Sequence, residues 1–214
     1  IITVSDILRL QAHSPHQLVL DIEKAASIDT LRELHQRIQK LILHLAGTGI
    51  AIREMVKLIA NLNDQVLIRL IDLLRAEKYP DLTDDFAFVV MGSEGRGEQT
   101  LSTDQDNGIV FRVVEGTAIE EARRRLLGFA RTVNDDLAAC GFPLCKGNIM
   151  ASNPDLCLTL DEWKSRFSDW IREPDPQALL NASIFFDFRV LYGNERFGDQ
   201  LRTWLNRAVK GNSA

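Results

Sequence analysis

The chain has 214 residues, 45% of them hydrophobic and 26% charged, with a formal net charge of −5. Such a composition belongs to folded globular proteins and excludes collagen-like, intrinsically disordered and mini-protein classes. The net negative charge argues against a basic surface that binds nucleic acid, and no apolar run is long enough to cross a membrane.

Two further features concern the context of the chain. No signal peptide opens the sequence, and the three cysteines form no C-x-x-C pair, so we expect a cytoplasmic protein with reduced, mostly buried thiols. The first residue is Ile1 rather than methionine, which indicates a piece of a longer protein.

The first 80 residues are predicted to be helical. Apolar residues recur at helical spacing from Asp29 to Ala46 and again from Ile50 to Tyr79, where Pro80 stops the second helix. Two such stripes joined by a short glycine-containing turn predict an antiparallel helical hairpin or bundle over residues 1–80. All four histidines lie in this region, and their spacing predicts no metal site.

A compact core is predicted over residues 81–153. An apolar strand from Phe86 to Met91 leads into a glycine-rich polar turn, and a second strand is expected from Thr103 to Val113. Residues 117–140 show helical spacing, and residues 143–150 are predicted as another short strand.

Residues 154–214 are predicted to form a C-terminal helical region. Thr159 and Glu162 have the S/T-x-x-E spacing of a capping box, which predicts a helix start. A second helix is expected from Asp175-Pro176 to Gly193, and a final helix follows.

The acidic excess is concentrated in residues 81–150, which hold 12 acidic and 7 basic side chains. Within this segment Asp104 and Asp106 are two residues apart, so on a regular strand their side chains point to one face. Two such carboxylates can share Mg²⁺ or Mn²⁺ together with the phosphate oxygens of a nucleotide. We therefore take both as candidate catalytic and metal-binding residues.

The glycine turn supplies candidates for phosphate binding, although it matches neither a Walker A loop nor the dinucleotide G-x-G-x-x-G spacing. Gly92 allows close backbone approach, Ser93 can donate to a phosphate oxygen, and Arg96 can neutralise phosphate charge. Glu98 could bind the metal directly or through water, or could orient Arg96, and Lys146 could contact phosphate. The alternative is a polar hairpin rim in which the glycines serve only the turn.

Residues 91–107, MGSEGRGEQTLSTDQDN, resemble the signature of a nucleotidyltransferase family. That family is related to the N-terminal part of the PII uridylyltransferases, within the DNA polymerase β-like superfamily. The resemblance continues through residues 145–154 and 184–189. It implies an α+β fold with a polymerase β-like core, built on a small mixed sheet and flanked by N-terminal helices and by a C-terminal helical region, residues 154–214, that binds the substrate.

The resemblance also implies a context and a set of roles. In such proteins the unit follows a cyclic-nucleotide-binding domain and a CBS pair, so residues 1–10 would be the tail of a CBS domain. Gly92 and Ser93 would bind the triphosphate, and Asp104 and Asp106 would bind the metals. Active members bring a third carboxylate on a later strand, but the strand expected for it here, Leu144–Met150, contains no acid. Asp187 and Arg189 are expected to form an ion pair or to line a cleft from a helix.

Three functional hypotheses follow. The first is a Mg²⁺-dependent enzyme that transfers UMP or AMP from a nucleoside triphosphate to a hydroxyl group, with a PII-like regulatory protein as a candidate acceptor. The second is a catalytically degenerate sensor that binds nucleotide without chemistry, and the third is a purely structural dimerisation module. We expect a homo-oligomer in the full-length protein.

Overall fold

The computed structural model describes residues 14–47, 51–99, 104–113, 116, 118–172 and 183–211. The chain folds into two compact units. The first, called the helical unit here, comprises Ile1–Pro80, Gly97–Asp104 and Asp135–Pro143. The second, called the sheet unit, comprises Asp81–Arg96, Gln105–Asn134 and Leu144–Ala214. The predicted division at residues 80 and 153 remains a prediction, and the proposed CBS tail at residues 1–10 lies outside the described residues.

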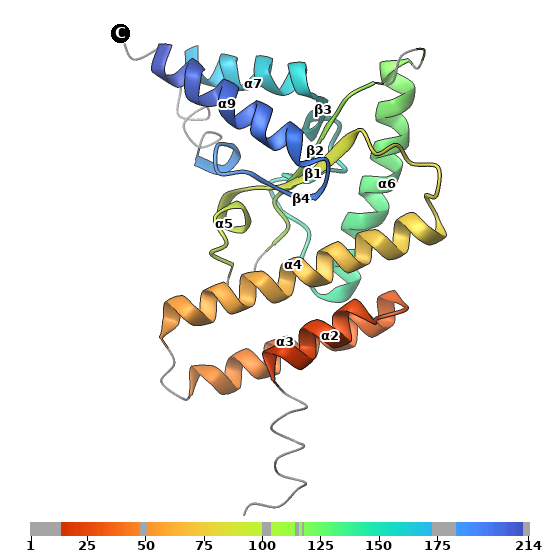
Figure 1. The fold of residues 1–214 in the computed structure, drawn as a ribbon, viewed down its shortest axis with the longest axis vertical. Coiled ribbons are helices and arrows are strands. Elements are labelled where there is room, and N and C mark those ends of the chain that lie inside the picture. Colours follow the sequence, from red (N-terminus) through yellow and green to blue (C-terminus); the bar gives the residue numbers. More distant parts are fainter. Residues whose placement is uncertain are drawn as a thin grey trace, which may run out of the picture. The chain divides into compact units, whose positions relative to one another are not determined.

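The helical unit contains three helices that pack on one another: α2 (Pro15–Glu23), α3 (Ile28–Ala46) and α4 (Ile52–Glu77) (Figure 1). The side-chain oxygens of Ser14 and Ser27 accept hydrogen bonds from backbone N–H groups in the first turns of α2 and α3. The apolar stripes predicted from the sequence face inward, with Leu31, Ile38, Leu62 and Leu70 at most 1% exposed. The prediction of a helical lead-in is confirmed for α3 and α4.

The sheet unit is built on four strands in the order β3-β2-β1-β4: β1 (Phe86–Val90), β2 (Asn107–Phe111), β3 (Cys157–Thr159) and β4 (Arg189–Gly193). β1 pairs antiparallel with β2 and with β4, whereas β2 pairs parallel with β3. The sheet is therefore small and mixed, as the predicted α+β fold with a polymerase β-like core requires.

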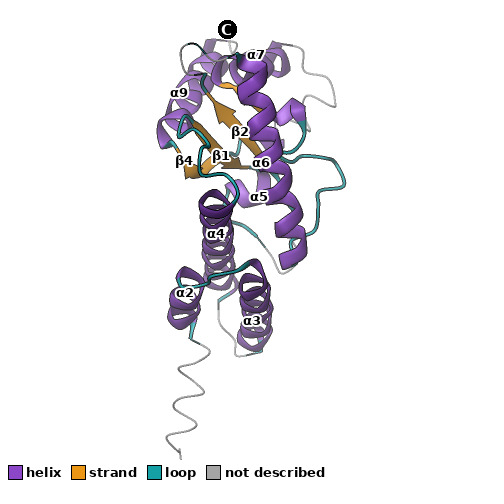
Figure 2. Ribbon diagram, turned by 90° about the vertical axis from the view of Figure 1, so that its right-hand side faces the viewer, coloured by secondary structure: helices purple, strands orange, loops and turns teal. Residues whose placement is uncertain are grey.

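Helices cover both faces of this sheet (Figure 2). On one face Ala87 and Val89 pack in a cluster with Trp163 and Phe167 of α7 (Leu160–Arg172) and with Leu201 of α9 (Glu195–Gly211). On the other face, Phe86 contacts Phe129 of α6 (Ile119–Cys140) edge to face. β1 is thus buried on both sides, which explains why its sequence is a continuous apolar run rather than an alternating one.

The predicted capping box at the start of α7 is confirmed. The Thr159 backbone N–H donates to Glu162 Oε2 at 2.7 Å, and the Glu162 N–H donates back to Thr159 Oγ1 at 3.3 Å. Arg123 of α6 donates to the other oxygen of Glu162 at 2.7 Å and to the Cys157 carbonyl at 2.6 Å. This arginine ties α6 to β3 and α7 instead of lying on a solvated helix face.

Three predictions of local structure are wrong. Residues 143–150 form turns rather than a strand, and Asn148 there has a φ of 56°. Residues 189–193 form strand β4 instead of the end of a helix, because they pair with β1. The second strand begins at Asn107, so Asp104 and Asp106 precede the strand. The predicted start of a helix at Asp175-Pro176 lies outside the described residues.

A search of the described helices for segments long and apolar enough to cross a membrane found none.

Candidate active site

The glycine-rich turn follows β1 directly and forms the short helix α5 (Gly92–Gly95). Gly92 has a φ of +56°, a conformation that disfavours residues with a Cβ atom. A Cβ at this position would lie 3.3 Å from Oδ2 of Asp106. Gly92 is therefore required both by the backbone conformation and by the closeness of a carboxylate.

Asp106 is held at the start of β2. The Met91 N–H donates to the Asp106 carbonyl at 2.9 Å, and Val90 pairs with Asn107 in the ladder. The glycine turn after β1 and the aspartate before β2 are therefore neighbours at one end of an antiparallel pair, although 14 positions separate Gly92 from Asp106.

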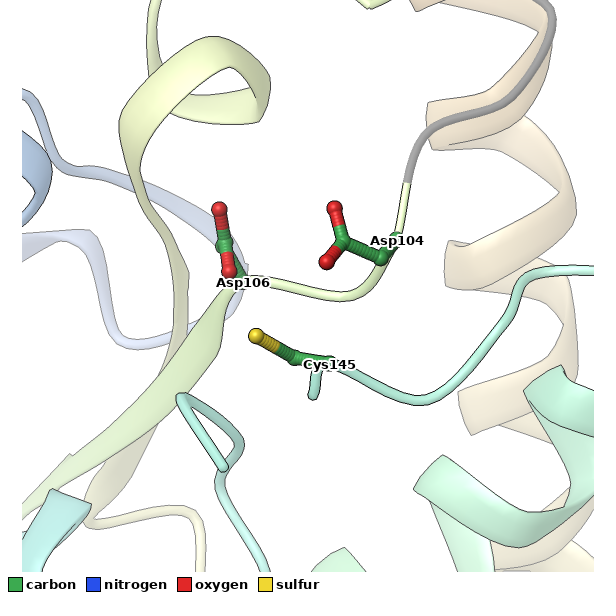
Figure 3. Close-up of side chains that lie close together, drawn as sticks. All are labelled: Asp104, Asp106 and Cys145. Carbon is green, nitrogen blue, oxygen red and sulfur yellow. The ribbon is translucent and has the colours of Figure 1, made fainter. Parts of the chain in front are cut away.

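Asp104, Asp106 and Cys145 form a group of potential metal ligands whose oxygen and sulfur atoms all lie within 4.8 Å of one another. Figure 3 shows the two carboxylates on the segment that leads into β2 and the thiol on the loop that follows α6. Asp104 is exposed, Asp106 is half-buried, and Cys145 is half-buried. The pairing of the two aspartates was predicted from a regular strand, but the structure achieves it in an extended segment outside the strand.

Cys145 is the member of this group that the sequence did not indicate. Burial raises the pKa of its thiol, and the charge and the hydrogen bond of Asp106 raise it further, against the opposing effect of the N–H groups of Ile149 and Gly147. At neutral pH the residue is therefore a thiol in hydrogen-bond contact with Asp106. No spacing rule connects a lone cysteine to an aspartate 39 positions earlier, so only the folded chain reveals the contact.

The position expected for a third carboxylate holds no acid in the structure either. Leu144–Met150 is a loop, and β3, the strand that pairs with β2, consists of Cys157, Leu158 and Thr159. The third potential ligand beside the two aspartates is the Cys145 sulfur. Carboxylate oxygens suit Mg²⁺ and Mn²⁺, whereas a thiol adds a softer donor. The donor set fits a divalent cation.

Arg96, the candidate phosphate ligand, closes the glycine turn and pairs with Asp187. Its Nη1 lies 2.8 Å from Oδ2 of Asp187, and both side chains remain 40–47% exposed. Asp187 was predicted to lie on a helix beside Arg189, but it precedes β4 and pairs with Arg96 instead. Arg189 donates to the carbonyl of Glu94 at 3.1 Å. The two contacts fasten α5 to the start of β4 and to the segment before it.

The remaining predicted residues occupy different places. Ser93 lies on α5 beside Gly92 and is partly exposed, and Lys146 follows Cys145 in the chain with an exposed side chain. Glu98 is exposed and is not a member of the ligand group found in the part of the chain that the structure describes. The structure thus brings Gly92, Asp104 and Asp106 together and adds Cys145. The roles expected of Glu98, binding the metal or orienting Arg96, stay predictions.

The segment that carries the aspartates rests on a buried set of side-chain amides. Asn134 of α6 donates to Gln105 Oε1 at 2.7 Å and to Asn107 Oδ1 at 3.0 Å. Nothing in the sequence pattern connected Gln105 and Asn107 with Asn134, which is 27 positions or more further along the chain. Asn134 is a polar residue within the apolar stripe of the predicted helix, and this is the sequence signal that could have indicated a buried hydrogen-bond contact.

A scan against protein-family models matches residues 36–177 to the family described as "Putative nucleotidyltransferase DUF294". The matched range includes the glycine turn, both aspartates and Cys145. A search of curated proteins found no match. Since the family model covers well over half of the 214 residues, the chain belongs to this nucleotidyltransferase family.

Proposed function

We propose that the chain is a Mg²⁺-dependent nucleotidyltransferase that moves UMP or AMP from a nucleoside triphosphate to an acceptor hydroxyl, with Mn²⁺ as an alternative cation. The observation that carries the proposal is the contact between the glycine turn and the aspartates, where a Cβ on Gly92 would come within 3.3 Å of Asp106. A phosphate-binding turn and a carboxylate pair at this closeness can serve one bound nucleotide.

Different residues of the chain are assigned to the cation and to the phosphates of the nucleotide. We assign Asp104 and Asp106 to the cation, which when bound supplies positive charge next to the phosphates and favours departure of pyrophosphate. Ser93 is assigned to a phosphate oxygen through its hydroxyl. Arg96 is assigned to the phosphate charge, and its pairing with Asp187 at 2.8 Å keeps the guanidinium beside the turn.

The transfer itself is a substitution at the α-phosphorus. The acceptor oxygen forms a bond to that phosphorus, the bond between the phosphorus and the bridging oxygen breaks, and pyrophosphate leaves with the electron pair. The hydroxyl proton passes to a carboxylate. We assign this role to Asp104, because its side chain is exposed and can meet an acceptor that arrives from solvent.

The acceptor is proposed to be a protein of the PII kind. Lys146, exposed beside Cys145, is assigned to the phosphates, and Glu98 is kept as a water-mediated ligand of the cation or an aid to Arg96. The protein is proposed to act in the cytoplasm as a homo-oligomer of a longer chain that carries CBS and cyclic-nucleotide-binding domains.

The test measures binding and transfer separately. Calorimetry with Mg²⁺ and each of the four nucleoside triphosphates should give metal-dependent binding, and α-labelled nucleotide should appear on a PII-like acceptor with release of pyrophosphate. Asp104→Asn and Asp106→Asn should each reduce transfer by at least about 100-fold, since a neutral amide is a poor ligand for a hard cation. The matched control is Asp161→Asn on α7, whose carboxylate is 90% exposed and pairs with Lys164.

Two results would contradict the proposal. One is transfer that survives in both aspartate variants at the level of Asp161→Asn. The other is binding of metal and nucleotide that leaves every supplied acceptor unmodified and releases no pyrophosphate, which would indicate a binding module without chemistry.

A further inference from the structure

One side chain, Asn134, holds both chain neighbours of Asp106. Its Nδ2 donates to Gln105 Oε1 at 2.7 Å and to Asn107 Oδ1 at 3.0 Å, and its backbone carbonyl accepts from Gln105 Nε2 at 3.0 Å. Three hydrogen bonds thus fix the residues on either side of Asp106 to a single position of α6. All these residues belong to the sheet unit.

The three amides are almost completely removed from solvent. Gln105 is 2% exposed, and Asn107 and Asn134 are each 1% exposed. In such surroundings water cannot replace a lost partner, and a buried amide left without one costs about 1–3 kcal/mol. The amides therefore hold one arrangement instead of exchanging among several.

Asn134 and Asn107 also fix the loop that follows Cys145. Ser152 N–H donates to Asn134 Oδ1 at 3.1 Å, and Ala151 N–H donates to Asn107 Oδ1 at 2.8 Å. The N–H of Asn107 in turn donates to the Ile149 carbonyl at 3.1 Å. Two segments far apart in the sequence, the one with Asp106 and the one that begins at Cys145, are therefore tied to each other through Asn134 and Asn107.

The backbone of Asp106 is restrained from two sides by these contacts. Its carbonyl accepts from Met91 on the β1 side, and its two neighbours are held from the α6 side. The freedom left to Asp106 is then mostly the rotation of its own side chain. Partners of this kind, which orient a metal ligand without touching the metal, typically change metal affinity by about 10–100-fold when they are removed.

We propose that Asn134 is a positioning residue for the cation site: by holding Gln105 and Asn107 it sets the place of the Asp106 carboxylate against Cys145 and the glycine turn. The inference rests on the proposed function, since it presumes that Asp106 binds a cation. It goes further, because it assigns a buried residue of α6, which contacts no ligand, to the affinity of the site.

The experiment compares Asn134→Ala with Asn63→Ala. Asn63 and Gln99 form a second buried amide pair, with Asn63 Nδ2 donating to Gln99 Oε1 at 3.1 Å, and both belong to the helical unit. Each variant removes a buried asparagine and the hydrogen bond that its side chain donates to a buried glutamine. Asn134→Ala also loses the bonds to Asn107 and Ser152, so it should lose more stability than Asn63→Ala, and urea unfolding without metal measures both losses.

The deciding measurement is the affinity for Mn²⁺ alone, from the loss of the free-ion electron paramagnetic resonance signal during titration. We expect Asn134→Ala to weaken Mn²⁺ binding by about 10–100-fold and Asn63→Ala to bind as the unchanged protein does. If Asn134→Ala fails to fold, Gln105→Met takes its place, because it removes two of the three bonds and nearly preserves the side-chain volume.

The outcomes separate the two proposals. If the unchanged protein binds Mn²⁺ and the Asn134 or Gln105 variant binds it equally well, the positioning role is wrong while the cation site stands. If Asn63→Ala weakens binding as much as Asn134→Ala does, the effect is one of general stability and the positioning role is again wrong. If the unchanged protein does not bind Mn²⁺, the proposed function fails, and the positioning role fails with it.

Discussion

The helical unit and the sheet unit both bury polar side chains, but they connect them differently. In the helical unit the described buried groups form separate contacts: Asn63 donates to Gln99, while the Nδ1 of His35 lies 2.9 Å from the Cys140 carbonyl and its ring stacks on Phe142. In the sheet unit Asn134 alone takes part in four hydrogen bonds, and two of its partners, Gln105 and Asn107, flank Asp106.

This difference separates stability from function. A buried contact that holds no residue beside a ligand can be replaced with a loss of folding free energy and little else. A buried side chain that is bonded to the residues on both sides of a carboxylate determines where that carboxylate lies. Its loss should therefore affect ligand binding as well as stability. Matched substitutions in the two units can test this contrast.

Among the remaining comparisons of the two units, the largest effect is expected at two glycines that both have a positive φ. Gly92 has a φ of +56° and Gly97 has a φ of +65°, so Gly92→Ala and Gly97→Ala should each cost about 1–2 kcal/mol of stability. A Cβ at Gly92 meets Asp106 Oδ2 at 3.3 Å, whereas for a Cβ at Gly97 the nearest neighbouring atom among the described residues is the Ala60 Cβ at 4.0 Å. We expect only Gly92→Ala to lose nucleotidyl transfer, by about 10-fold or more.

Urea unfolding and the transfer assay on the same preparations measure both quantities. Equal loss of activity in the two variants would show that strain in the turn, and not the approach to the carboxylate, limits the site.

A smaller effect is expected at the cysteines. Burial raises the pKa of Cys140 to about 11 and that of Cys157 to about 12, so these thiols should resist alkylation in the folded protein. Cys145 is half-buried and should react first, although slowly, because its pKa is raised as well. Mn²⁺ should slow its alkylation severalfold, since the sulfur lies within 4.8 Å of the ligand atoms of Asp104 and Asp106.

Mass spectrometry of peptides labelled with iodoacetamide at pH 8 gives the rate at each cysteine. Asp106→Asn is the control, because it should abolish the protection by Mn²⁺. Protection that persists in that variant would mean that the ion acts elsewhere on the chain.

The smallest effect concerns pH and belongs to the helical unit. Burial lowers the pKa of His35, against the raising effect of its hydrogen bond to the Cys140 carbonyl. A histidine with a lowered pKa in the folded state binds protons more readily when unfolded, so stability is complete above the unfolded pKa of about 6.5 and falls as the pH drops below it.

Thermal unfolding between pH 7.5 and 5.5 should show this loss, by a few degrees at most. His35→Gln should remove part of the pH dependence, whereas His44→Gln, at an exposed position of α3, should leave it as it is. The same pH slope in all three proteins would contradict the assignment to His35. Divalent cation affinity should be the same in His35→Gln as in the unchanged protein, which again separates the two units.

Much of the site could be predicted because its parts are local. The spacing of Asp104 and Asp106, the glycine turn and the capping box of α7 each depend on residues a few positions apart. The match of residues 36–177 to a nucleotidyltransferase family agrees with the function that these motifs indicate. The contacts that assemble the motifs could not be predicted in the same way, because Cys145, Asn134 and Asp187 reach the site from distant positions.

Two of the three wrong predictions of local structure, those for residues 189–193 and 143–150, have the same origin. Residues 189–193 carry a pattern that a helix or a strand could satisfy, and pairing with β1, about 100 positions earlier, selects the strand. Residues 143–150 are short and apolar enough for a strand, but no ladder includes them. The Asn107 N–H donates one hydrogen bond to the Ile149 carbonyl, and this bond does not extend into a ladder.

The sequence by itself determined helices α3 and α4, the apolar central strands and the pair of candidate carboxylates, because side-chain periodicity and short spacings act within one element. The tertiary structure decided which segment joins the sheet as β4, which residue pairs with Arg96, and that a thiol stands where a third carboxylate was expected. Those choices depend on hydrogen bonds and packing between distant segments, whose free energy exists only once the chain has folded.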